Sequence, residues 1–133
     1  MDHLNSALNV VQTWLAAVNN RNNEGVLQAS DPNIEIVGPR GSGFGHQLLQ
    51  DWLHHAHVTL ASLRTFACED QVVVLQHAVW HSIETGDVMG EANVASQFRV
   101  EGGRVVQYAR FSDLDEALQA AQLDFADEIE SDS

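Results

Sequence analysis

Hydrophobic residues recur at steps of three and four near the start of the chain and at steps of two further on. The first period is set by Leu4, Leu8, Val11, Leu15 and Val18, which predict a long amphipathic helix. Shorter elements should follow: a helix over residues 24–29, a strand around residues 34–36, a glycine-rich loop over residues 38–45 and a helix over residues 46–55. The first part of the chain is therefore expected to be mainly helical.

After residue 57 the period becomes that of extended strands and stays so as far as residue 111. Four strands are predicted, over residues 58–67, 71–83, 88–100 and 104–111, with short polar turns that favour antiparallel pairing. A final short helix is expected to open at Asp113. Because helices and strands are segregated, the fold class is α+β, with a curved antiparallel sheet wrapped around the N-terminal helices.

The sequence predicts which face points inward for one of these strands but leaves it open for two others. On the third strand, Ala92, Val94, Ser96, Phe98 and Val100 form the inner face. The second strand is apolar on both sides, so either the face with His77 and His81 or the face with Gln76 and Trp80 could point inward. The last strand has the same ambiguity. We favour Trp80, Tyr108 and Arg110 inside, because Ala109 and Phe111 would then suit an outer dimer contact.

Composition argues against several classes of function. The chain has 133 residues, a size typical of one domain, and a formal net charge of -13, which disfavours binding to nucleic acid. All six basic residues are arginines, which excludes chemistry that needs a lysine amine. No apolar run is long enough to cross a membrane, no signal peptide is visible, and the lone thiol of Cys68 suits a reducing compartment, so we expect a cytoplasmic protein.

Several short motifs together resemble one known superfamily. They are the opening helix with Trp14, the Gly38–Gly41 stretch followed by Gly45 and Trp52, the valine run 72–74 with Trp80, and the segments 98–106 and 110–118. In order and spacing they are similar to the nuclear transport factor 2-like superfamily, in its SnoaL-like (polyketide-cyclase-like) branch. The resemblance implies a cystatin-like, cone-shaped barrel over residues 1–122, and a homodimer that forms through the outer sheet face. Residues 123–133 would then be an acidic, solvated tail.

Metal and cofactor sites are not predicted. His77 and His81 lie four residues apart on one strand, hence about 13 Å from each other, which is too far to share an ion. Once metal and cofactor sites are set aside, the chemistry that we expect is acid-base catalysis beside an apolar pocket. The candidate catalytic residues are Tyr108 as a hydrogen-bond donor, Arg110 as a partner for an anion, Asp113 as an acid and His77 as a base. The candidate ligand-binding residues are Trp14, Trp52, Trp80 and Phe98.

The superfamily contains isomerases, cyclases and hydrolases as well as binding modules, so the resemblance does not specify a reaction. We expect a pocket for a small, mostly apolar molecule, with or without cofactor-free acid-base catalysis. The alternative is a non-catalytic module for ligand binding or dimerisation. A third possibility is an adaptor that recognises basic partners through its acidic tail.

Overall fold

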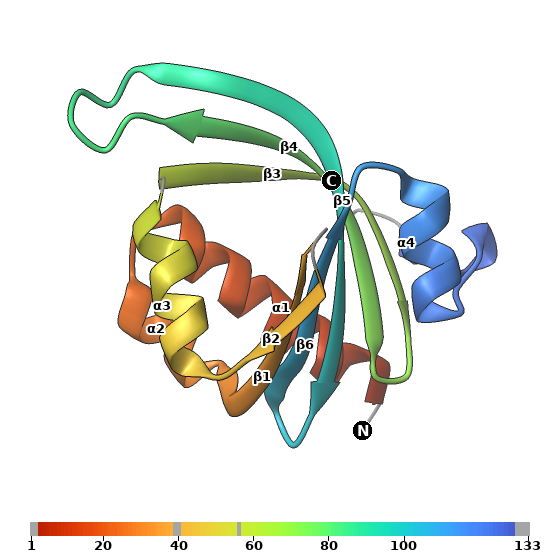
Figure 1. Cartoon of the computed structure of the whole chain (residues 1–133). Helices are drawn as coiled ribbons and strands as arrows, with labels where there is room; N and C mark the ends of the chain where they lie inside the picture. The colour runs from red at the N-terminus through yellow and green to blue at the C-terminus, as the bar shows by residue number, and fades with distance from the viewer. Residues whose placement is uncertain (1–2, 39–40, 56, 130–133) are drawn as a thin grey trace.

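The computed structural model describes residues 3–38, 41–55 and 57–129. Its helices are α1 (His3–Asn19), α2 (Asn23–Gln28), α3 (His46–His55), α4 (Leu114–Ala121) and the short 3-10 helix η1 (Phe125–Asp127). Its strands are β1 (Ser30–Gly38), β2 (Gly41–Phe44), β3 (His57–Cys68), β4 (Gln71–His81), β5 (Val88–Glu101), β6 (Arg104–Phe111) and β7 (Glu128–Ile129). Figure 1 shows a strongly bent sheet with α1, α2 and α3 on its concave side and α4 on the other side.

The described strands form one sheet in the order β2-β1-β6-β5-β4-β3-β7. The four strands β3 to β6 pair antiparallel in sequence order, which confirms the predicted antiparallel layer and its short turns. Only β1 joins the sheet in parallel, beside β6, with Ile36 opposite Tyr108. The predicted α+β class and the curved sheet around N-terminal helices are therefore confirmed.

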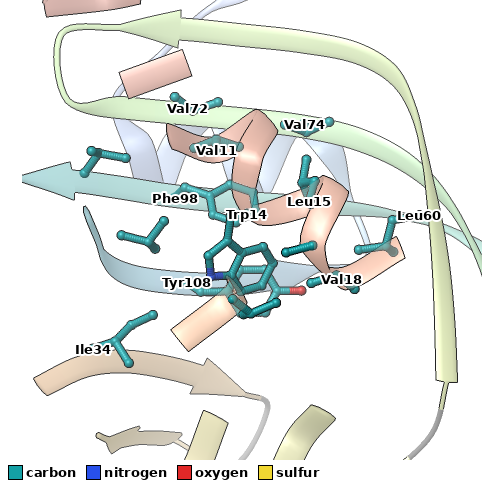
Figure 2. Close-up of a cluster of buried hydrophobic side chains, with 14 of the residues drawn as sticks. Val11, Trp14, Leu15, Val18, Ile34, Leu60, Val72, Val74, Phe98 and Tyr108 are labelled. Atoms are coloured by element: carbon teal, nitrogen blue, oxygen red, sulfur yellow. The ribbon is translucent and has the colours of Figure 1, made fainter. Parts of the chain in front are cut away.

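The long helix α1 fills the hollow of the sheet because its apolar stripe is wide and continuous. Val11 and Trp14 are fully buried, and Leu15 and Val18 are nearly so. They belong to one core cluster with residues of β3, β4, β5 and β6, among them Leu60, Val72, Val74 and Phe98 (Figure 2). Burial of this stripe is the main stabilisation of the layer arrangement.

The inner faces of the strands are those that we favoured. Val72, Val74 and Ala78 on β4 belong to the main core cluster, and Trp80 packs against it. His77, one residue away from Ala78, lies on the outer face. Tyr108 on β6 belongs to the same cluster and is only 3% exposed. The alternative register, with His77 inside, is therefore wrong.

A second, smaller cluster lies on the outer face, under α4. Phe66, Val73 and Ala95 of the sheet pack there against Ala117, Leu118 and Ala121 of the helix, and Phe111 joins them from the side. We expected Phe111 and Ala109 to serve a dimer contact, but Phe111 contacts this cluster within the chain and Ala109 is 2% exposed. The apolar character of both faces of β4 follows from this second layer.

The first part of the predicted tail carries secondary structure, namely η1 and β7. Ile129 and Glu128 pair with Thr65 and Phe66 of β3, so β7 covers one edge of the sheet. The guanidinium of Arg64 donates hydrogen bonds of 2.8 and 2.7 Å to the two carboxylate oxygens of Glu128. The guanidinium carbon of Arg64 also lies 5.5 Å from the centre of the Phe125 ring. A two-point ion pair and an aromatic contact thus hold the segment on β3.

Three further expectations in the first half of the chain need correction. The glycine-rich stretch predicted as a loop is partly a strand, because β2 pairs with β1 from Glu35–Phe44 to Gly38–Gly41. The strand predicted around residues 34–36 extends over the whole of β1. The second helix begins at Asn23, and the side chain of Asn22 caps it by accepting a hydrogen bond from the Gly25 amide. Pro39 and Arg40 lie outside the described residues.

Candidate functional site

Four aromatic side chains from four elements meet on the concave face. Trp14 comes from α1, Trp52 from α3, Phe98 from β5 and Tyr108 from β6. The Trp14 ring centre lies 5.0 Å from that of Tyr108, 5.3 Å from that of Phe98 and 6.1 Å from that of Trp52. Figure 2 shows Trp14 lying against Tyr108. The sequence predicted these residues as a site, and the structure brings them together.

Trp14 and Phe98 form the base of this aromatic cluster. Both side chains are fully buried. The Trp14 indole nitrogen donates a 2.9 Å hydrogen bond to the Ser30 hydroxyl, which in turn donates a 2.7 Å hydrogen bond to the Val26 carbonyl. The polar atom of Trp14 is therefore used within the fold. We interpret Trp14 and Phe98 as the support beneath a site rather than as its exposed wall.

The accessible part of the concave face lies further along β4, β5 and β6. Trp52 and Trp80 are partly exposed, and Arg110 is exposed. The guanidinium carbon of Arg110 lies 5.7 Å from the centre of the Trp80 ring, across the intervening strand β5. On β5 the residues opposite Trp80 and Ala78 are Gly90 and Ala92, which leave room above the strand. We call Trp52, Trp80, Ala92 and Arg110 the rim.

Beneath the rim, three polar side chains cross the sheet. Gln76 and Ser96 are fully buried, and the Ser96 hydroxyl donates a 2.7 Å hydrogen bond to the Gln76 side-chain oxygen. Gln76 Nε2 is buried and makes no hydrogen bond with any described residue, while Tyr108 Oη is buried next to the Ser96 hydroxyl. An unpaired buried donor costs about 1–3 kcal/mol. Gln76 Nε2 carries this cost inside a mainly apolar layer.

Burial keeps Tyr108 in its protonated form. Desolvation raises the pKa of the phenol above its usual value, while the nearby charge of Arg110 and a hydrogen bond with Ser96 act in the opposite direction. The net shift is upward because the ring lies deep in the cluster. At neutral pH Tyr108 is thus a hydrogen-bond donor.

The other two predicted catalytic residues lie outside this region. Asp113 is the N-cap of α4, where its carboxylate accepts a hydrogen bond from the Asp115 amide. His77 lies on the outer face of β4, with Nδ1 2.8 Å from the Asn93 side-chain oxygen and Nε2 3.1 Å from a Glu91 carboxylate oxygen. These hydrogen bonds raise the pKa of His77, the one with Asn93 most. The structure therefore separates His77 and Asp113 from the aromatic cluster.

Sequence reasoning did not single out Gln76 or Ser96 as functional residues. A signal was present, because Gln76 is a polar residue in phase with the inward-facing Val72, Val74 and Ala78. Such a residue must find a partner inside the fold or leave part of its amide unpaired. Recognising it required knowledge of which face of β4 points inward.

A separate groove lies on the outer side of the helices. It encloses about 680 Å³ and is bordered by residues of α1, by residues of α2 and by the β5–β6 turn. Its border consists of Asn9, Val10, Thr13, Ala16, Ala17, Asn20, Asn22, Gly25, Gln28, Ala29 and Gly103. None of the predicted site residues is among them. The groove has no charged side chain and is distinct from the concave face.

Within residues 3–38, 41–55 and 57–129, no three His, Cys, Asp or Glu side chains gather as they would around a metal ion. In the same part of the chain, no helix has the length and hydropathy needed to cross a bilayer.

Comparison with known proteins identifies the fold. No protein-family model and no curated protein matches the chain. Solved structures do match. An NTF2-like protein of unknown function from Burkholderia pseudomallei is 20% identical, with a TM-score of 0.70 over 87% of this chain and 97% of that one. A provisionally assigned polyketide cyclase from Xanthomonas campestris pv. campestris is 17% identical, with a TM-score of 0.68 over 86% of this chain and 96% of that one.

A third neighbour was solved with a ligand. Rv0760c from Mycobacterium tuberculosis, in complex with estradiol-17β-hemisuccinate, is 17% identical, with a TM-score of 0.71 over 83% of this chain and 95% of that one. At these identities the likeness establishes the architecture alone. The chain has the NTF2-like fold, as the sequence resemblance implied.

Proposed function

We propose that this NTF2-like domain binds a small, mostly apolar molecule on its concave face, next to the rim formed by Trp52, Trp80, Ala92 and Arg110. The observation that carries the proposal is the partial exposure of two tryptophan rings on the inner side of the sheet, one of them beneath a guanidinium group. Indole rings offer large apolar contact areas at low entropic cost. Arg110 adds a positive charge in a chain that is otherwise strongly acidic.

The ligand in the structure of Rv0760c supports this proposal by its chemistry. Estradiol-17β-hemisuccinate combines a rigid apolar body with one carboxylate. The rim offers the matching features, since Trp52 and Trp80 could contact the apolar body while Arg110 pairs with the carboxylate. This compound is therefore a suitable probe for the site.

Binding without proton transfer is the function that the geometry supports best. The predicted base His77 and the predicted acid Asp113 both lie away from the aromatic cluster. Cofactor-free acid-base catalysis of the isomerase, cyclase or hydrolase type is the second candidate. One observation favours it, because Tyr108 is a buried phenol with a raised pKa and could donate a hydrogen bond to an oxygen that gains negative charge.

We also propose that the chain forms a homodimer through the part of the outer sheet face that α4 leaves free. Leu63, at the register shift between Ser62 and Arg64 on β3, is 52% exposed and is the large apolar residue that we assign to this contact. Replacing it by lysine should shift the molar mass in light scattering from dimer towards monomer. An unchanged mass in the Leu63→Lys variant, or a wild-type monomer at all concentrations, contradicts this part of the proposal.

Calorimetric titration with estradiol-17β-hemisuccinate tests the binding function. Wild-type protein should bind it saturably, and Trp80→Leu should weaken binding about tenfold, since an indole ring buries a large apolar area. Phe125→Leu is the control, because Phe125 is also an accessible aromatic residue, 54% exposed, but lies beside β3 at the C-terminal segment. Absence of saturable binding, or an equal loss in the two variants, overturns the proposal.

A further inference from the structure

Strand β3 has one edge that no described strand covers over most of its length. It pairs with β4 along one side, whereas on the other side β7 meets only Thr65 and Phe66. Within the part of the chain that the structure describes, residues 57–63 therefore have no strand on that side. Such an edge presents N–H and C=O groups that a further strand can join.

The sequence of this edge offers little protection against a further strand. Residues 57–63 read HVTLASL, with no proline, no glycine and no lysine, arginine or acidic side chain. Short, uncharged segments with high strand propensity are those most prone to pair with another copy of themselves. The register shift, which would disturb such pairing, comes only at the end of the segment, between Ser62 and Arg64. Protection of the edge must therefore come from outside the strand.

The end of α1 supplies a side chain that occupies the backbone groups of this edge. Asn19 Nδ2 donates a 3.0 Å hydrogen bond to the Leu60 carbonyl, and Asn19 Oδ1 accepts a 2.8 Å hydrogen bond from the Leu60 amide. Figure 2 shows Leu60 next to the part of α1 that carries Val18. Facing residues of an antiparallel pair exchange the same two bonds through their backbones. The Asn19 carboxamide thus takes the place of a residue in a neighbouring strand.

Arg21 covers a second backbone position of the same edge. Its Nη1 donates a 2.7 Å hydrogen bond to the Val58 carbonyl. The backbone of Arg21 has a φ of 58°, and the amide of Asn22 donates to the carbonyl of Ala17, as in the turn that commonly ends a helix. Glycine is the favoured residue in this conformation. An arginine there is explained by its side chain, which reaches β3.

We propose that Asn19 and Arg21 close the β3 edge against strand addition by a second copy of this chain. A second copy is the fitting occupant because two β3 edges can pair antiparallel about a two-fold axis, each with the same backbone groups and uncharged side chains. A charged partner would find no opposite charge on residues 57–63. The proposal does not depend on the ligand site, and pairing at this edge differs from a dimer through the outer sheet face.

The double variant Asn19→Ala, Arg21→Gly tests the proposal, because it removes both side chains and relieves the turn after α1. At high salt, which screens the net charge of -13, its molar mass in light scattering should rise with concentration above that of the wild-type protein. In dilute solution the Leu60 amide should exchange about three- to tenfold faster than in wild type, as for one lost hydrogen bond. At high concentration this exchange should slow again, because a strand of the second copy pairs with Leu60.

Two further variants serve as controls. Asn20→Ala, Arg104→Ala removes the same side-chain types away from β3, since Asn20 borders the groove between α1 and α2 and Arg104 lies opposite Glu101 of β5. It should keep the wild-type mass and Leu60 exchange. Asn19→Asp, Arg21→Gly loses the bond to the Leu60 carbonyl but places like charges opposite each other when two edges meet. It should also keep the wild-type mass.

The results separate edge pairing from a general loss of stability. The wild-type mass at every concentration in Asn19→Ala, Arg21→Gly, with Leu60 exchange fast throughout, contradicts the proposal. Equal association of Asn19→Asp, Arg21→Gly also contradicts it, because exposure of the core would then be the cause. If thermal unfolding shows that the double variant does not fold, Asn19→Ala alone decides, with the same two measurements and the same contradicting results.

Discussion

The guanidinium group of Arg110 lies over the ring of Trp80, with 5.7 Å between the guanidinium carbon and the ring centre. Arg110 belongs to β6 and Trp80 to β4, so the contact spans β5 on the concave side of the sheet. It keeps a cation next to an apolar surface that solvent can reach. This arrangement suits a molecule with an apolar body and one negative group.

Replacing Arg110 by glutamine should therefore weaken anionic ligands selectively. We expect Arg110→Gln to reduce the affinity for estradiol-17β-hemisuccinate about three- to fivefold, as for a partly solvated ion pair. Affinity for neutral estradiol should stay unchanged. Arg104→Gln makes the same charge change at an exposed position on the same strand and serves as control. If Arg104→Gln weakens the anionic ligand equally, Arg110 acts through the overall charge of the protein and not through contact with the ligand.

The hydrogen bond between Trp14 and Ser30 should contribute measurably to stability. Ser30→Ala removes the acceptor of the buried indole nitrogen and the donor to the Val26 carbonyl. We expect the free energy of unfolding in urea to fall by about 1–3 kcal/mol, the cost of unpaired buried groups. Ser112→Ala, at an exposed position, should change it little. A Ser30→Ala variant as stable as wild type would contradict the geometry of α1 on β1.

His77 should titrate above its ordinary range. The hydrogen bond with Asn93 is the larger cause of the raised pKa, and Glu91 adds to it. Because the folded-state pKa is the higher one, this stabilisation is complete below the unfolded-state pKa. It is lost as the pH rises through the folded-state pKa. NMR titration should give His77 a pKa above about 6.5.

Two variants check the cause of that shift. Asn93→Ala should lower the pKa of His77 more than Glu91→Gln does, since the Asn93 contact is the stronger influence. Glu84→Gln removes an acid from the β4–β5 turn and should have little effect. A larger change from Glu91→Gln than from Asn93→Ala would reverse the assignment.

The contact between Arg64 and Glu128 should hold the C-terminal segment on β3. Glu128→Gln removes the charge that Arg64 pairs with, and we expect faster amide hydrogen exchange at Glu128 and Ile129, which pair with β3. Since both side chains are about one-third exposed or more, global stability should change little. Glu116→Gln on α4 is the control. Unchanged exchange at Glu128 and Ile129 would mean that strand pairing alone suffices.

Much of this fold could be predicted from period and turn chemistry. The steps of two in β3 to β6 and the short turns between them specify antiparallel neighbours, which the register confirms. The face of β4 was harder to predict because α4 covers Val73 from outside while α1 covers Val74 from inside. Because both faces of β4 are apolar, its sequence shows no alternation of apolar and polar residues that would identify the inner face.

The site was less predictable for a different reason. Asp113 matched the pattern of an acid after the last strand, but its position directly before α4 makes it a helix cap. The aromatic residues could be named because they are bulky and lie on inward positions. Gln76 could not, because its significance depends on a partner two positions along the next strand and on the lack of another. Strand β2 was missed because glycines usually mark turns.

The central claim is that a small apolar molecule binds on the concave face beside Trp52 and Trp80. An NMR titration of the nitrogen-labelled protein with estradiol-17β-hemisuccinate tests it most directly, because the three tryptophans give three separate indole signals. We predict that the Trp52 and Trp80 indole signals shift together with the Arg110 amide. Shifts confined to Thr13 and Gly25 in the groove between α1 and α2, with the indole signals unmoved, would contradict the claim.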